Sequence, residues 1–195
     1  MDPRLRGDDI EARALAVQLF SWWGRNHLRL NCHLTEEYTN VEHHEADMNE
    51  YDLDILRLHS QGFCCAQIVL QLALEMQGVE NPGLIRAMSG LCVGFSSTQG
   101  ACGALTGAAC LIAYHAGKGT VDEEAHDRLP LMLTELADWF EEFATGRFGG
   151  INCSSIVADG KPDASICGGL VSECYGKAMT ILVESGFDPS SDVHG

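Results

Sequence analysis

The stretch that decides the fold is GACGALTGAAC, residues 100–110, which holds three glycines, four alanines and two cysteines and carries no charge. Gly103 and Gly107 lie four positions apart, so on a helix they share one face with the alanines beside them. Small residues at this spacing let another backbone approach closely, which compensates for the helix stability that glycine costs. The stretch therefore predicts a central, tightly packed helix over about residues 103–115.

The same region is poor evidence for a membrane span, although no Asp, Glu, Lys or Arg occurs between Arg86 and Lys118. After the polar run at 96–100, its apolar part covers only residues 101–116, whereas a span needs about 20 residues. The apolar residues 12–23 follow acidic residues and precede no small-x-small cleavage site, which argues against a signal peptide. We therefore expect no membrane span and a cytoplasmic protein.

Composition narrows the class of protein further. The chain has 195 residues, 46% of them hydrophobic, and a formal net charge of −16. This size suits one domain with a real core, and so negative a surface argues against nucleic acid as a partner. Cysteines stay reduced by default in the cytoplasm, so nine of them indicate redox or metal chemistry more than a disulfide scaffold.

Helical spacing of apolar residues continues on both sides of the central stretch, as with Ile68, Leu72 and Met76. No segment shows the strict alternation of a half-buried strand. We predict an all-α fold, a compact bundle of about five or six helices. The helical segments cover residues 51–59, 63–76, 82–88, 103–115, 131–145, 154–157 and 167–185.

The chain changes character near residue 48, because residues 1–47 hold five of the nine arginines and four of the eight histidines. One interpretation is an N-terminal extension without a fold of its own, with translation starting at Met48. The other is a short helix at 10–23 that docks Trp22 and Trp23 on the main body. We favour the extension, which leaves residues 48–195 as the helical cysteine-motif domain.

Deleting residues 1–47 is accordingly expected to leave the thermal stability nearly unchanged. Surface changes away from a packed region seldom alter the free energy of unfolding by much. A loss of more than about 2 kcal/mol on denaturant unfolding would show that the segment packs on the core.

Four of the nine cysteines fall at predicted helix starts: Cys65, Cys102, Cys153 and Cys167. The positive end of a helix dipole lowers the pKa of a thiol and favours the thiolate, which attacks disulfides or binds metal. We take these four as candidate catalytic residues and rank Cys102 as the most reactive. Disulfide and metal bonds both need close sulfurs, so the four are expected to converge in space.

The remaining cysteines suit other roles. Cys92, Cys110 and Cys174 lie in apolar or helical runs and are expected to be buried packing residues. Cys64 could assist its neighbour Cys65, and Cys32 lies in the N-terminal segment. The absence of a CxxC motif excludes a thioredoxin-type site and a zinc ribbon.

The motifs around the four candidates resemble those of the C-GCAxxG-C-C family of redox-active proteins, small chains with four characteristic cysteines. The resemblance covers about residues 50–188 and rests on CAQ at 65–67, on CGALTG at 102–107, and on Cys153 and Cys167. Two features depart from the pattern: the family label spells GCAxxG where this chain reads ACGAxxG, and Cys174 competes with Cys167 for the fourth place. The resemblance implies a helical fold and redox-active cysteines, and it supplies no substrate.

Three hypotheses on function remain open at this point. The first is thiol–disulfide or electron-transfer chemistry by the four cysteines, with a protein redox partner and no required cofactor. The second is a metal or iron–sulfur site with Cys65, Cys102, Cys153 and Cys167 as ligands. The third is a non-enzymatic interaction protein, and all three leave a homo-oligomer open.

Overall fold

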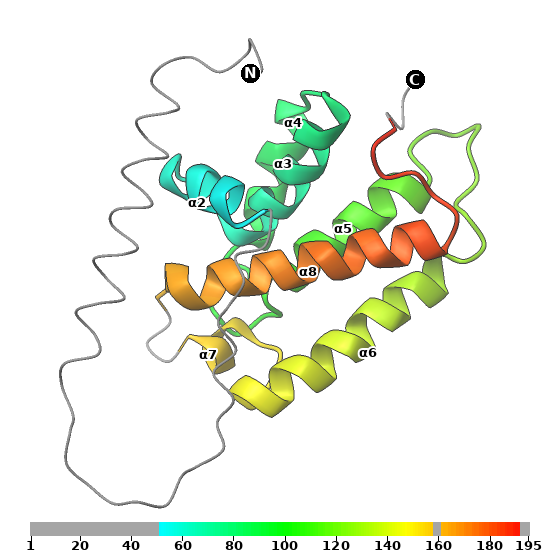
Figure 1. Cartoon of the computed structure of the whole chain (residues 1–195). Helices are drawn as coiled ribbons and strands as arrows, with labels where there is room; N and C mark the ends of the chain where they lie inside the picture. Colours follow the sequence, from blue (N-terminus) through cyan, green and yellow to red (C-terminus); the bar gives the residue numbers. More distant parts are fainter. Residues whose placement is uncertain (1–50, 158–160, 192–195) are drawn as a thin grey trace, which may run out of the picture. The chain divides into compact units, whose positions relative to one another are not determined.

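The computed structural model describes residues 51–157 and 161–191. These residues form helices and no strand, which confirms the all-α prediction. The elements are α2 (Asp52–Ser60), α3 (Cys65–Gln77), α4 (Pro82–Met88), the 3-10 helix η2 (Ser89–Leu91), α5 (Gly103–Ala116), α6 (Leu129–Phe148), α7 (Cys153–Ile156) and α8 (Ala164–Glu184), as Figure 1 shows.

The chain divides into two units, Met1–Met48 and Asn49–Gly195. All described residues belong to the second unit. The predictions made for residues 1–47, including the helix at 10–23 with Trp22 and Trp23, therefore lie outside the described residues.

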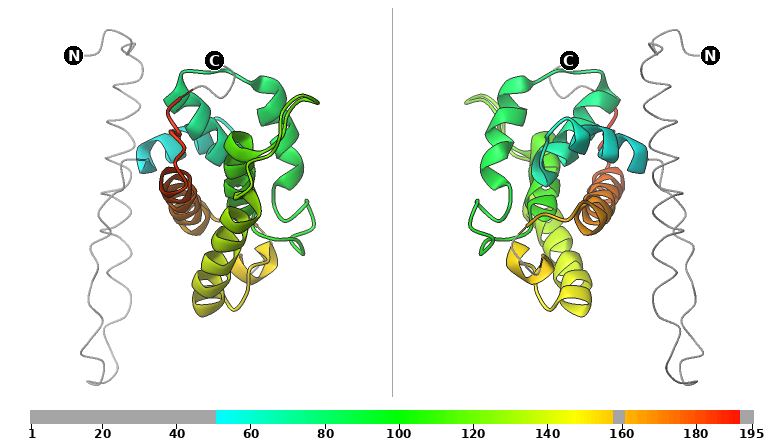
Figure 2. Two further views of the ribbon diagram at one scale, coloured as in Figure 1. Left: turned by 90° about the vertical axis from the view of Figure 1, so that its right-hand side faces the viewer. Right: turned by 90° about the vertical axis from the view of Figure 1, so that its left-hand side faces the viewer.

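Helix α5 is the central helix that the glycine-rich stretch predicted. It packs against α3, α6 and α8 (Figures 1 and 2). A Cβ added to Gly107 would lie 3.0 Å from both the Cα and the carbonyl oxygen of Ala66 on α3, and 3.2 Å from the Cβ of Val69. The glycine therefore permits direct contact between two helix backbones, as small residues at this spacing predict.

Helix α8 is long and apolar enough, by length and composition alone, to cross a membrane. Its apolar character has a simpler cause, because α8 packs against α2, α3, α5 and α6. Tyr175 and Leu182 on α8 are almost fully buried in the core, and a core helix passes the same test of length and composition.

Helix α8 begins three residues before the predicted start, because the carboxylate of Asp163 caps it by accepting from the Ser165 N–H at 2.8 Å.

Between η2 and α5 the chain makes a left-handed turn that no sequence pattern predicted. Val93, Gly94, Phe95 and Ser96 have φ angles of 52°, 56°, 58° and 61°. The Ser96 N–H donates to the Cys92 carbonyl at 2.9 Å, which closes one helical turn of the unusual hand. Because non-glycine residues pay about 1–2 kcal/mol each for this conformation, the turn needs support from its surroundings.

That support comes from the segment that leads into α7. The Ser154 N–H donates to the Thr98 carbonyl at 2.7 Å, and the Cys153 N–H donates to the Gly100 carbonyl at 3.0 Å. These bonds fix the start of α7 against the end of the left-handed turn. They also place Cys153 beside the start of α5, although the two lie far apart in the sequence.

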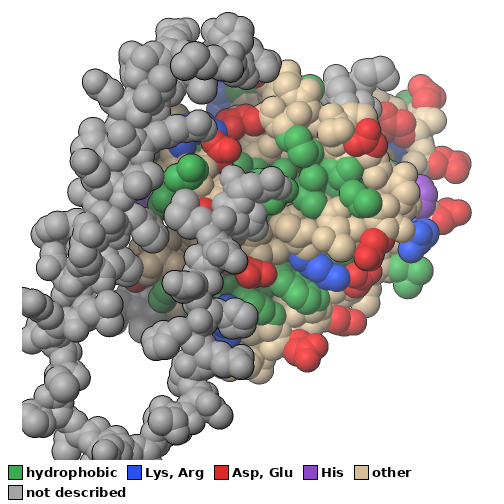
Figure 3. All heavy atoms as spheres, in the orientation of Figure 1, with side chains coloured by type: hydrophobic (Ala, Val, Ile, Leu, Met, Phe, Trp, Pro, Cys, Tyr) green, Lys and Arg blue, Asp and Glu red, His purple; other side chains and the backbone are tan. Residues whose placement is uncertain are grey.

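The surface agrees with the acidic composition. Asp and Glu side chains are spread over the described part of the face that Figure 3 shows, in keeping with the net charge of −16. This charge would repel anions approaching from solution at low salt.

Candidate functional site

A cavity of about 320 Å³ opens between α2, α3, α5, α7 and α8. All four candidate cysteines line it, each from a different helix or helix cap. Cys65 comes from α3, Cys102 from the residue preceding α5, Cys153 from α7 and Cys167 from α8. The rest of the wall is mainly aliphatic and aromatic, with Ile55, Phe63, Ile68, Ile156 and Val171 among its residues. The structure thus brings the four predicted residues around one cavity.

Cys65 has the most elaborate environment of the four. Burial raises the pKa of its half-buried thiol, while hydrogen bonds from the backbone at Val93, Ala66 and Gly103 lower it. A hydrogen bond that lowers a thiol pKa is one donated to the sulfur, since it favours the thiolate. The starts of α3 and α5 and the left-handed turn therefore all direct backbone donors at this sulfur.

Gly103 is required by the position of Cys65. A Cβ placed on Gly103 would overlap the Cys65 sulfur. This contact gives a physical reason for the first glycine of the CGALTG motif. Gly103 admits the sulfur and Gly107 admits the α3 backbone, so both glycines serve the contact between α3 and α5.

Cys102 corrects part of the sequence analysis. It precedes α5 as predicted, and hydrogen bonds from the backbone at Ala104 and Leu105 lower its pKa, but burial outweighs them and raises the pKa to about 12. Only 7% of the residue is exposed. The helix start therefore does not give this buried thiol the low pKa that its position in the sequence predicts.

Cys153 and Cys167 complete the cavity wall. Cys153 is 9% exposed, and burial raises the pKa of its thiol. Cys167 is half-buried in the first turn of α8, where its N–H donates to the Asp163 carbonyl at 2.7 Å. Burial raises the Cys167 pKa, partly offset by a hydrogen bond with the Asp163 backbone. Cys174 is fully buried and does not line the cavity, which favours Cys167 over Cys174 for the fourth place in the motif.

The four thiols also influence one another electrostatically. Negative charge on Cys65 raises the pKa of Cys102, of Cys153 and of Cys167. Such mutual effects require short separations through a poorly screened interior. Cys65 and Cys167 therefore each interact with all three other members of the set.

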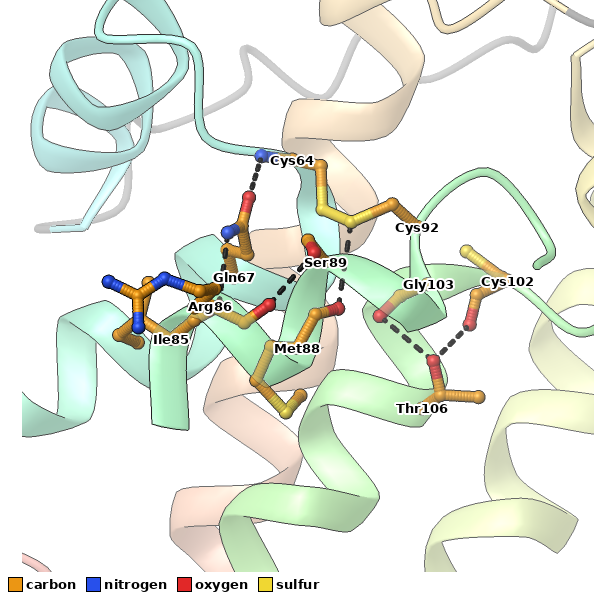
Figure 4. The surroundings of a disulfide bond; sticks show 10 residues. All are labelled: Cys64, Gln67, Ile85, Arg86, Met88, Ser89, Cys92, Cys102, Gly103 and Thr106. Carbon is orange, nitrogen blue, oxygen red and sulfur yellow. Dashed lines mark hydrogen bonds between the residues drawn. A yellow bond between two sulfur atoms is a disulfide. The ribbon is translucent and has the colours of Figure 1, made fainter. Parts of the chain in front are cut away.

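A disulfide joins Cys64 to Cys92, with the two Cα atoms 6.0 Å apart (Figure 4). The sequence analysis gave Cys64 an assisting role and Cys92 a packing role, and it missed this pairing. Cys64 caps α3, and its N–H donates to the Gln67 side chain at 3.2 Å. Cys92 directly precedes the left-handed turn, so the disulfide ties that turn to the start of α3 beside Cys65.

A peptide map of the non-reduced protein is expected to contain a cross-linked fragment holding Cys64 and Cys92. The Cα separation lies within the range that disulfides require. Mass spectrometry after proteolysis under acidic conditions, which suppress exchange, checks this pairing. Recovery of Cys64 linked to Cys65 instead would contradict the structure.

A metal site formed by the same four thiols is the alternative to redox chemistry. Within the described residues, no group of three or more His, Cys, Asp or Glu side chains stands close enough to hold a metal ion. The four cavity thiols would have to move together to do so, because thiolate–metal bonds measure about 2.3 Å.

The fold and the cavity define an all-helical protein with a pocket lined by cysteines at or near helix starts. The family model described as "Putative redox-active protein (C_GCAxxG_C_C)" matches residues 63–181. The chain belongs to this family, as the motif resemblance indicated. No curated protein and no solved structure matches the chain.

Proposed function

We propose that the protein is a thiol–disulfide redox protein in which Cys65 attacks the disulfide of a substrate. The observation that carries this proposal is the cavity that all four candidate cysteines line. Cys65 is half-buried rather than buried, and it combines access to the cavity with backbone donors that favour its thiolate. Both access and thiolate fraction determine the reactivity of a cysteine.

The reaction would proceed in two exchange steps. The Cys65 thiolate attacks one substrate sulfur, the substrate disulfide breaks, and the first substrate thiolate leaves and takes up a proton. A second cavity thiol, one of Cys102, Cys153 and Cys167, then loses its proton and attacks the Cys65 sulfur, which releases the second substrate thiol. Two electrons and two protons pass from two protein thiols to the substrate, and a protein disulfide remains.

Disulfide mapping tests the proposal. The anaerobically prepared protein is oxidised gently with diamide, a thiol-selective diazene, and its linked peptides are identified by mass spectrometry. We expect a new disulfide between Cys65 and one of the other three cavity cysteines. If the cavity thiols stay unpaired while Cys110 reacts, the proposal is wrong and a packing role for these cysteines gains support.

The reaction rate is expected to rise with pH because burial raises the pKa of Cys65 above the usual 9.0. Below its pKa, the thiolate fraction of a thiol grows about tenfold for each pH unit. The rate of Cys65 alkylation by iodoacetamide should therefore rise steadily between about pH 7 and pH 9 without levelling off. The other thiols that line the cavity with Cys65 also have pKa values raised by burial. A plateau reached below about pH 7 would show instead that the backbone donors outweigh burial.

An iron–sulfur or other soft metal site is the second candidate function. Four thiols around one cavity, with backbone donors directed at Cys65, favour it, because such donors stabilise anionic clusters. Metal analysis and a visible spectrum of freshly purified anaerobic protein distinguish the two candidates. A broad cluster absorption with stoichiometric iron would favour the metal site, whereas a metal-free protein that forms the Cys65 disulfide would favour thiol redox chemistry.

A further inference from the structure

We infer that the disulfide reduced at this site belongs to a small, uncharged and apolar molecule. This inference rests on the proposed thiol–disulfide function and names its substrate class. The sequence alone predicts a protein redox partner. The composition and the size of the cavity point to a different partner.

The first argument is charge. None of the described residues that line the cavity is Asp, Glu, Lys or Arg, and His59 is the one histidine among them. A carboxylate carried into such a cavity would lose its hydration without gaining a Lys or Arg partner, which is costly. Anionic disulfides are therefore disfavoured at the reacting sulfur, independently of the acidic surface outside.

The second argument is the nature of the wall. Beside the sulfurs stand apolar side chains from several helices, among them Ile55, Phe63, Ile68 and Val171. Such a wall gains free energy by covering apolar substrate surface. Backbone donors at Val93 and Gly103 are already directed at Cys65, so they favour the reacting thiolate rather than a charged group of the substrate.

The third argument is size. The volume of about 320 Å³ lies at the lower end of the range of ligand cavities, about 300–1,000 Å³. Cys102 and Cys153 are at most 9% exposed. The second exchange step, in which either sulfur attacks Cys65, therefore takes place inside the cavity wall. A substrate disulfide has to enter the cavity to be reduced, and a small apolar molecule does so more readily than a folded protein.

Two aromatic disulfides test the inference: uncharged 4,4′-dithiodipyridine and dianionic 5,5′-dithiobis(2-nitrobenzoate). Modification of Cys65 in the folded, full-length protein is followed over time by peptide mass spectrometry. Each rate is divided by the rate of the same reagent with the same peptide in the denatured chain, which removes differences in intrinsic reactivity. The reactions run in about 1 M salt, where the Debye length is about 3 Å and the surface charge is screened.

We expect the normalised rate of the uncharged reagent to exceed that of the anionic reagent at least about tenfold. Leu56 lines the cavity and is half-buried, so Leu56→Lys should raise the relative rate of the anionic reagent. Leu56→Gln is the matched control, because it adds polarity without charge and should leave the preference nearly unchanged.

The outcomes separate this inference from the function on which it rests. Equal normalised rates, or no effect of Leu56→Lys on the preference, would overturn the apolar substrate class while leaving diamide-induced pairing of Cys65 intact. If a protein disulfide oxidises Cys65 faster than either small reagent does, the apolar substrate class is wrong and a protein partner is favoured. Failure of Cys65 to pair with any cavity cysteine under diamide would instead overturn the thiol–disulfide function itself.

Discussion

Replacing Cys65 with serine is expected to slow the reduction of a neutral disulfide by the protein at least about tenfold, a loss of about 1.4 kcal/mol or more in transition-state stabilisation. Serine preserves the shape of the side chain but is a far weaker nucleophile toward disulfides than a thiolate. The measurement is the rate at which the reduced protein consumes a neutral disulfide under anaerobic conditions. Circular dichroism and denaturant unfolding verify that the variant still folds.

The matched control is Cys110→Ser. Cys110 is a free, half-buried cysteine on α5 that does not line the cavity, so its loss should leave the rate nearly unchanged. Replacing the second cavity cysteine, which attacks the Cys65 sulfur in the second exchange step, has a different effect. The first exchange step still occurs, so a mixed disulfide on Cys65 accumulates. If Cys65→Ser and Cys110→Ser slow the reaction equally, Cys65 is not the attacking thiol.

The sequence predicted the positions of the four cavity cysteines well because helix starts are marked locally. Asn81 and Pro82 at the start of α4 illustrate this, since Asn81 accepts from the Leu84 N–H at 3.0 Å as a helix cap should. Small residues in 103–107 similarly marked the contact between α3 and α5. Such features can be predicted from the sequence because each depends on residues that are close together along the chain.

The pairing of Cys64 with Cys92 could not be predicted in the same way. Disulfide connectivity depends on which cysteines the fold brings together, and spacing alone does not reveal it. Here the pairing depends on the left-handed turn after Cys92, in which Val93 and Phe95 take positive φ angles. Residues with large or branched side chains rarely adopt this conformation, so no pattern indicated it.

The direction of the pKa shifts was missed for a related reason. A helix start is visible in the sequence, but the desolvation that opposes it depends on how many other helices surround the thiol. At Cys102 the backbone donors are present as expected, and burial still raises the pKa to about 12. Reactivity thus depends on tertiary packing as well as on position within a helix.

The substitution Gly107→Leu is expected to destabilise the protein by about 1–3 kcal/mol, as overpacking of a core usually does. Even a single Cβ at this position would lie 3.0 Å from the Ala66 Cα and carbonyl oxygen. These are backbone atoms of α3, which cannot move aside by changing a rotamer. The leucine must therefore push α3 away from α5, and the free energy of unfolding measured with urea should fall.

The matched control for this variant is Gly176→Leu on α8. Gly176 also lies within a helix, but a Cβ there meets nothing within 4 Å. Both variants remove a glycine that costs a helix about 1 kcal/mol, so Gly176→Leu should be neutral or stabilising. The difference between the two variants isolates the contact between α3 and α5.

Because Gly107 and Cys65 serve the same contact between these helices, Gly107→Leu should also change the rate of Cys65 alkylation, whereas Gly176→Leu should not. Equal stability of the two variants would mean that α3 does not lie against this face of α5.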